Sequence, residues 1–235
     1  MSPRINSYGQ PVGDDLPQWV ARPRPERIAL TGDYCTLTPF SAKEHGKALF
    51  HAYSQAQDGR DWTWLSVGPF LAEQDYLEYA ATMEQSQDPL HYAIVDNASG
   101  LPVGSVALMR IDVRNGVVEV GHVTYSPLLK GTRVATEAQY LLMKYVFDTL
   151  GYRRYEWKCD NLNEPSRRAA QRLGFQPEGV FRQAVVYKGR TRDTAWFSLL
   201  DKEWPSNKKV LASWLSGDNF DANGSQLHPL SFFRS

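Results

Sequence analysis

The feature that most constrains the fold is a change in hydrophobic period after Pro89. From there, apolar residues alternate with polar ones in three successive segments that turn residues separate. Strict alternation fits a half-buried strand, and short turns join neighbouring strands, so this pattern predicts an antiparallel meander. The predicted strands are 91–96, 103–112 and 117–125, with turns at 97–102 and 114–116.

A strongly periodic helix follows the meander. Its apolar residues between Val134 and Val146 recur at spacings of four, seven and eight, and Gly151 is expected to end it. A further strand is predicted at 154–159. The two strands of such a strand–helix–strand unit are expected to run parallel and side by side. The sheet is therefore expected to be mixed.

The remaining segments complete an α/β (α+β) chain with the order β-α-α-β-β-β-α-β-α-β-β. Ser41 is expected to cap the first helix, and Gly174 to end the last one. The additional predicted elements are a strand at 34–38, helices at 42–55, 71–85 and 164–173, and a hairpin of strands 181–188 and 191–200.

Three parts are expected along the chain. Residues 1–33 are rich in Pro, Gly and Arg and predict an extended arm that packs on the domain. Residues 34–204 form the single domain, since this length can bury a full core. Residues 205–235 are expected to form a C-terminal tail with a short amphipathic piece at 210–215.

Composition excludes several classes of protein. Lysine plus arginine (26) balance aspartate plus glutamate (26), so no global field favours nucleic acid or an anionic membrane as a partner. No run reaches the ~18–20 apolar residues of a membrane span. Cys35 and Cys159 form no CxxC pair, and no signal peptide is recognised. Reduced thiols and a cytoplasmic location are therefore expected.

The turn that opens the long helix, Lys130 to Thr136, has the features of an anion site. A helix N-terminus presents unpaired N–H groups and a partial positive charge. Gly131 allows close approach of the backbone, Ala135 leaves space over the first turn, and Lys130 and Arg133 add cations. The alternative is an ordinary cap with solvated charges. The dinucleotide glycine motif and the P-loop are both absent.

A second helix start lies about thirty residues further on. Asn163 is a natural N-cap, and Ser166 lies in the first turn. Arg167 and Arg168 oppose the helix dipole there, a conflict that a bound anion would relieve. Together, the two helix starts suggest a site for the pyrophosphate and pantetheine of coenzyme A.

The chain resembles a known family. The region from about Tyr92 to Pro205 is similar to the GCN5-related N-acetyltransferase (GNAT) superfamily, and most similar to its RimJ/RimL-like branch of ribosomal-protein N-terminal acetyltransferases. The resemblance implies the family's fold, with helices on both faces of a mixed, mostly antiparallel sheet. The matching motifs are Glu119-Val120-Gly121-His122, Thr136-Glu137-Ala138, Asn163-x-x-Ser166, Leu173-Gly174-Phe175, Glu178-Gly179 and Arg192-Asp193-Thr194.

The resemblance implies how acetyl-CoA is held. The family's pyrophosphate motif falls on Lys130, Arg133 and Ala135, but Arg133 stands where the family has glycine, so its side chain must point away from the diphosphate or bond to it. The strand edge at Val123–Tyr125 would hold the pantetheine, and Asn163 and Ser166 the thiol end. The implied cofactor-binding set is Val123, Tyr125, Lys130, Gly131, Thr132, Arg133, Val134, Ala135, Thr136, Asn163, Ser166 and Arg167.

Candidate catalytic residues are Glu119, His122 and Ser166. Glu119 is expected to act either as a base through water or as part of an ion pair, and His122 either as a base or as a core residue. Being three residues apart, both reach one amine only if a bulge interrupts the strand. Many family members use a tyrosine as the acid, but Ala170 occupies that position. The acid is therefore Ser166 or water.

Aromatic residues are clustered in the loop 61–70. Trp62, Trp64 and Phe70, with Tyr125, are expected to shape a substrate pocket. Burial of the loop aromatics in the core is the alternative.

The leading prediction is a metal-independent N-acetyltransferase that moves the acetyl group of acetyl-CoA to a primary amine by direct attack in a ternary complex. The acceptor is a small molecule or a protein N-terminus, and the protein a monomer or homodimer. The alternative is a CoA-binding regulatory or interaction protein without turnover. An NTP-dependent enzyme is disfavoured, because paired metal-binding carboxylates are missing too.

Overall fold

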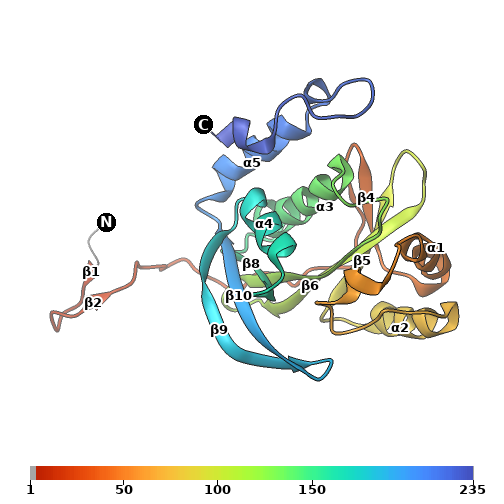
Figure 1. Ribbon diagram of the computed structural model, residues 1–235. Coiled ribbons are helices and arrows are strands. Elements are labelled where there is room, and N and C mark those ends of the chain that lie inside the picture. Colours follow the sequence, from red (N-terminus) through yellow and green to blue (C-terminus); the bar gives the residue numbers. More distant parts are fainter. Residues whose placement is uncertain (1–3, 235) are drawn as a thin grey trace.

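The computed structural model describes residues 4–234, and its centre is an eight-stranded sheet (Figure 1). The strand order is β3-β4-β5-β6-β7-β8-β10-β9, and only the β7–β8 pair is parallel. This confirms the predicted mixed, mostly antiparallel sheet. The strands are β3 (Leu30–Thr31), β4 (Cys35–Pro39), β5 (Leu90–Asp96), β6 (Pro102–Asp112), β7 (Val117–Tyr125), β8 (Arg154–Asp160), β9 (Gln176–Tyr187) and β10 (Arg190–Leu200).

Helices cover both faces of the sheet, as predicted (Figure 1). Ser41 caps α1 by accepting the Glu44 N–H, and Gly174 ends α4 in the left-handed conformation. The helices are α1 (Ala42–Ser54), α2 (Glu73–Gln85), α3 (Arg133–Lys144), α4 (Glu164–Leu173) and α5 (Trp204–Leu215). Short turns are η1 (Gly59–Trp62), η3 (Gly217–Asn219) and η4 (Leu230–Arg234), and a π-helical turn, η2 (Tyr145–Thr149), follows α3.

Two hydrophobic cores result, one on each face. Alternate residues of β5 show the division, since Tyr92 and Ile94 pack with α3, α4 and α5, whereas Ala93 packs with α1 and α2. Residues of α5 such as Trp204 and Leu211 belong to the larger core. The segment expected to begin a tail therefore starts with a helix that packs on the domain.

The N-terminal arm has two parts. Strands β1 (Arg4–Ile5) and β2 (Pro11–Val12) form a small hairpin that projects from the domain (Figure 1). From Trp19 onward the arm contacts the domain, because the Trp19 Nε1 donates to the Arg114 carbonyl (2.8 Å) and the Arg22 N–H donates to that of Val113 (2.9 Å).

Candidate active site

The strands β7 and β8 separate at the centre of the sheet. Their parallel pairing runs from Val117–Arg154 to Val120–Trp157 and then stops. Two cavities, of about 870 Å³ and about 540 Å³, lie on either side of this opening. The residues common to the lining of both are Trp64, Val123, Trp157, Asn163 and Ser166. These five residues, the junction, are where a ligand in one cavity can meet a ligand in the other.

The larger cavity contains the start of α3. Thr132 is the N-cap, and its Oγ1 accepts the Ala135 N–H (3.3 Å). Gly131 lies before it with a φ of +74°, a conformation that glycine adopts without strain. The first turn of a helix leaves N–H groups without intrahelical partners. Lys130, Gly131, Thr132, Ala135 and Thr136 all line this cavity, so one end of it has the donors that an anion requires.

Arg133 and Val134 lie outside the lining of both cavities. The Arg133 guanidinium stacks over the Tyr34 ring (4.2 Å) and faces Phe220 (5.3 Å). Of the two orientations left open by the sequence, the side chain thus takes the one that points away from the cavity. Val134 packs against the larger core.

A lysine at this end is held by the facing loop. Lys130 forms an ion pair with Asp61 of η1, across the larger cavity that both residues line. The cavity is also lined by residues that the sequence did not assign to the site, among them Tyr53, Arg60, Gln139, Arg172 and Gln226.

The start of α4 forms the opposite wall. The Asn163 Oδ1 accepts the Ser166 N–H (3.1 Å), and the Ser166 Oγ accepts a hydrogen bond from the Trp157 Nε1 (2.9 Å). Both side chains lie at the junction. Arg167 instead donates to the Asn161 carbonyl (3.3 Å) and lines neither cavity, so this carbonyl, without any anion, relieves part of its conflict with the helix dipole.

The smaller cavity contains both candidate bases, because β7 has a bulge. Ala107 pairs with Gly121, but Ser105 pairs with Thr124, so β7 carries one extra residue there. His122 lies in this bulge with a φ of +48°. The bulge reverses the alternation of side chains, and Glu119 and His122 consequently line the same cavity.

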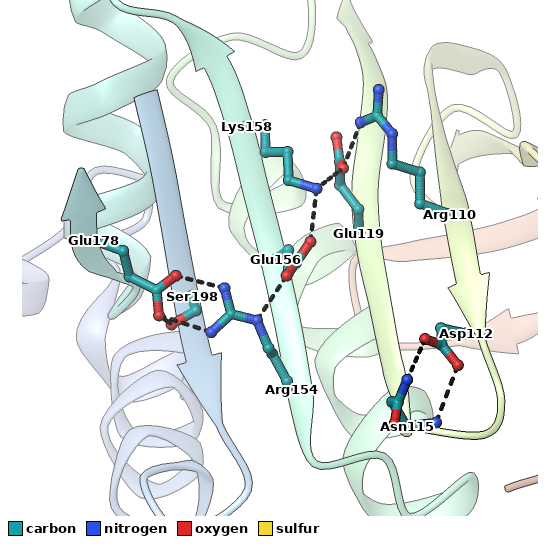
Figure 2. A network of polar contacts seen from close by, with 9 residues as sticks. All are labelled: Arg110, Asp112, Asn115, Glu119, Arg154, Glu156, Lys158, Glu178 and Ser198. Carbon is teal, nitrogen blue, oxygen red and sulfur yellow. Dashed lines mark hydrogen bonds and ion pairs between the residues drawn. The ribbon is translucent and has the colours of Figure 1, made fainter. Parts of the chain in front are cut away.

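Glu119 lies in a row of alternating charges that crosses the sheet (Figure 2). Its Oε2 is 2.6 Å from the Arg110 Nη1 and 2.9 Å from the Lys158 Nζ, and Lys158 also pairs with Glu156 (2.7 Å). The side chains of Glu119 and Lys158 are only 4% and 7% exposed. This geometry favours the ion-pair role for Glu119, since two cations already occupy its carboxylate.

His122 contacts a second imidazole. Its ring centroid lies 5.0 Å from that of His91 in an edge-to-face arrangement. Burial lowers the pKa of His122, although the Glu119 carboxylate opposes this shift. Burial also lowers the pKa of His91, to about 3. His122 is therefore neutral at neutral pH, the state that a base requires.

The loop aromatics divide between cavity and core. Trp64 is at the junction and Trp62 lines the larger cavity, but Trp62 is also buried edge-to-face against Tyr53 (5.4 Å) and Phe70 (5.3 Å). Phe70 lines neither cavity and stacks on Tyr79 (5.2 Å). Its ring fills the smaller core.

The hairpin β9–β10 holds the loop 61–70 in place through hydrogen bonds. The Lys188 Nζ donates to the Trp62 carbonyl (2.7 Å), and the Arg190 guanidinium donates to that of Thr63 (2.6 Å). The buried Tyr187 hydroxyl donates to Asp160 (2.7 Å). The loop and the hairpin therefore enclose the site together.

Tyr125 and Val123 lie on the free edge of β7 and line the larger cavity. The Tyr125 hydroxyl accepts from the Gln139 Nε2 (2.8 Å), and burial raises its pKa.

Cys35 and Cys159 are free and buried. Within residues 4–234, no helix is long and apolar enough to span a membrane, and no three acidic, His or Cys side chains gather as metal ligands.

Comparison with solved structures gives the same fold. A GCN5-related N-acetyltransferase from Brucella melitensis is 49% identical, with a TM-score of 0.92, over 93% of this chain and 99% of that one. A probable GNAT-family acetyltransferase from Chromobacterium violaceum is 39% identical, with a TM-score of 0.77, over 87% of this chain and 100% of that one.

Proteins similar in sequence belong to the same family of acetyltransferases. The Bacillus subtilis protein YdaF, provisionally named a ribosomal N-acetyltransferase, is 30% identical over 45% of this chain and 57% of its own length. This is consistent with the RimJ/RimL-like branch. The family model for the acetyltransferase (GNAT) domain matches residues 34–176, more than half of the chain. The chain therefore belongs to the GNAT acetyltransferase family, and it is an acyltransferase.

Proposed function

We propose that this protein transfers the acetyl group of acetyl-CoA to a primary amine by direct attack in a ternary complex. The observation that carries the proposal is the junction between the two cavities. One cavity has an anion-binding helix start, the other contains a neutral imidazole, and Ser166 lies between them. Two substrates can thus bind from opposite sides of the sheet and react where β7 and β8 separate.

The larger cavity fits acetyl-CoA. Its volume of about 870 Å³ lies within the range of ligand pockets. The α3 start supplies N–H donors for the diphosphate, and the β7 edge beyond Val120 supplies main-chain groups for the pantetheine amides. Two lining side chains, Ser126 and Gln139, each have a buried oxygen (Oγ and Oε1) without a hydrogen-bond partner among the described residues. A ligand with amides offers such partners.

His122 is the proposed base. An attacking amine must lose a proton, and the neutral ring of His122 can accept it directly or through water. The Glu119 carboxylate favours the charged form of the ring, so it stabilises the imidazolium as the proton arrives. In this proposal, Glu119 acts through His122 and remains paired with Arg110 and Lys158.

Ser166 is the proposed acid for the departing thiolate. Its Oγ accepts from Trp157, so its own proton is available to donate towards the junction. Ala170, at the position where many relatives have tyrosine, is fully buried in the larger core. Ala170 lines neither cavity and has no acidic proton, which supports Ser166 over that position.

The proposal is tested by following thiol release from acetyl-CoA with a panel of primary amines. We expect release that depends on both the amine and the protein. Thiol release that is equally fast without an amine would mean hydrolysis and would contradict the proposed transfer. No thiol release with any amine would also contradict it and would leave a CoA-binding protein without turnover.

We expect Ser166→Ala to lower kcat about tenfold. This is less than the usual effect of a general acid, because a thiol with a pKa near ~8.5 is a good leaving group. The KM for acetyl-CoA should change little. Steady-state rates at saturating amine measure this, with the exposed Ser206→Ala as the control. An unchanged kcat would assign the proton to water.

We expect Lys130→Ala to weaken CoA binding roughly five- to tenfold, because a charge-assisted contact to phosphate is lost. Titration calorimetry measures the Kd, and added salt should narrow the difference between the two proteins. Lys43→Ala removes an exposed lysine on α1 and serves as the control. Equal Kd values would show that Lys130 stays with Asp61 when CoA binds.

A further inference from the structure

Five charged side chains line the smaller cavity, and four of them are already partnered. Glu119 pairs with Arg110 and Lys158. Asp160 accepts from the Tyr187 hydroxyl (2.7 Å) and the Leu162 N–H (2.9 Å). The fifth is Arg192, which has no carboxylate within 4.0 Å anywhere in residues 4–234.

Arg192 is anchored by one nitrogen only. Its Nε donates to the buried Thr194 Oγ1 (3.1 Å), and its guanidinium lies 5.9 Å from the centroid of the Tyr187 ring. Neither terminal nitrogen donates to a described residue. Burial raises the pKa of Cys159, which lines the same cavity, and the positive charge of Arg192 opposes this shift. The guanidinium is thus fixed in place with two donor groups free.

A second unused donor lies on the same strand. The Trp196 Nε1 is buried and has no hydrogen-bond partner among the described residues, and its side chain lines the smaller cavity. The Trp196 ring packs against Phe181 (4.5 Å between centroids) and under the Lys158 ammonium (3.8 Å). This wall therefore offers hydrogen-bond donors and an aromatic surface, which suits a ligand rich in acceptor oxygens.

The strand register sets how far such a ligand must reach. His122 lies two residues beyond Val120–Trp157, the last pair of the β7–β8 ladder, whereas Arg192 lies five residues before Phe197, the β10 residue that pairs with Trp157. Because β10 is antiparallel to β8, both residues lie beyond the same end of the ladder, offset by about three residues of roughly 3.3 Å along the strands. Across the sheet their backbones are at least two strand spacings of roughly 4.8 Å apart, since β7 and β8 have separated there. An α-carboxylate, two bonds from its amine, is too close to that amine. A carboxylate one or two residues along a peptide can reach.

We propose that Arg192, assisted by the Trp196 N–H, selects acceptors that carry a carboxylate one or two residues away from the attacking amine. The preferred acceptor is then an acidic peptide or an amine of similar length and charge. This inference rests on the proposed acetyl transfer, but it adds a preference that transfer by itself does not require.

The test compares two tripeptide amides, Ser-Gly-Glu-NH2 and Ser-Gly-Gln-NH2, which differ only in one carboxylate remote from the amine. We expect kcat/KM for thiol release to favour the glutamate peptide about tenfold or more. In Arg192→Gln this preference should disappear, with little change for the glutamine peptide or in the KM for acetyl-CoA. Arg192→Lys should restore part of it, and Trp196→Phe should reduce it.

Arg182→Gln is the matched control, since Arg182 is exposed on the same hairpin and lines neither cavity of the site. This variant should keep the full preference for the glutamate peptide.

Equal turnover of both peptides by the unaltered protein overturns the inference and leaves acetyl transfer intact. An equal loss of kcat/KM for both peptides in Arg192→Gln overturns it as well. Free glutamate preferred over both peptides would overturn the proposed length.

Calorimetry with the two peptides in the presence of CoA makes the test independent of turnover. Tighter binding of the glutamate peptide, lost in Arg192→Gln, supports the inference. Equal or absent binding of the two peptides overturns it. By contrast, the absence of thiol release with every amine tested would overturn the proposed function itself.

Discussion

Replacing His122 with glutamine should lower kcat at least a hundredfold. Glutamine keeps a polar side chain of similar size but cannot accept the proton of the attacking amine, and general bases contribute about 10²–10⁴ in rate. Steady-state kinetics at saturating acetyl-CoA and amine measure the effect. The control is His51→Gln, at an exposed position on α1. A kcat within twofold of the unaltered protein would mean that water alone removes the proton.

The pH dependence gives a second signature of His122. Burial places its pKa below the usual 6.5, so the ring is neutral and active at neutral pH. As the pH falls through that lowered pKa, the ring is protonated and the rate is lost. The ratio of the kcat of the unaltered protein to that of His122→Gln cancels the titration of the amine. This ratio should be constant near neutrality and fall only below about pH 6.5.

Replacing Lys158 with methionine should lower the free energy of unfolding by about 3 kcal/mol, near the lower end of the range for breaking a buried ion pair. Methionine preserves the volume of the side chain but removes the charge between Glu119 and Glu156 (Figure 2). Each carboxylate retains one arginine partner, which limits the loss. Urea unfolding measures it.

Lys209→Met, at an exposed position on α5, is the control and should leave the free energy of unfolding nearly unchanged. A variant as stable as the unaltered protein at neutral pH would show that Lys158 contributes little net stabilisation to the row of charges.

The order of strands and helices could be predicted because local patterns and packing agree over most of the chain. The parallel pairing of β7 and β8 followed from the strand–helix–strand unit alone. The start of β9 was placed too late, at 181 rather than 176. Pro177 and Gly179 obscure its pattern there, and an edge strand tolerates both because one of its edges carries no ladder.

The bulge in β7 was recognised only as a condition for Glu119 and His122 to act together. Gly121 was a usable signal, since an isolated glycine inside a strand often marks a bulge. A Cβ at Gly121 would lie 2.2 Å from the Met109 sulfur. The glycine can be read from the sequence, but its contact with Met109 cannot, because only tertiary packing brings these two residues together.

Other site residues depend on contacts between distant segments. Trp157 reads as a core residue of β8, yet its indole N–H reaches Ser166. Gln226 is brought to the larger cavity by a tail that the Trp214 Nε1 holds (3.0 Å). No local period predicts either contact. By contrast, Asn163 was recognised correctly as a cap, because capping is a local preference.

A crystal structure with bound acetyl-CoA would show whether the two helix starts and the junction hold the cofactor as proposed. We expect the diphosphate to contact main-chain N–H groups between Gly131 and Thr136. We expect the acetyl group to lie at the junction, between Ser166 and the ring of His122. A diphosphate bound away from the start of α3, or an acetyl group pointing away from the smaller cavity, would contradict this proposal.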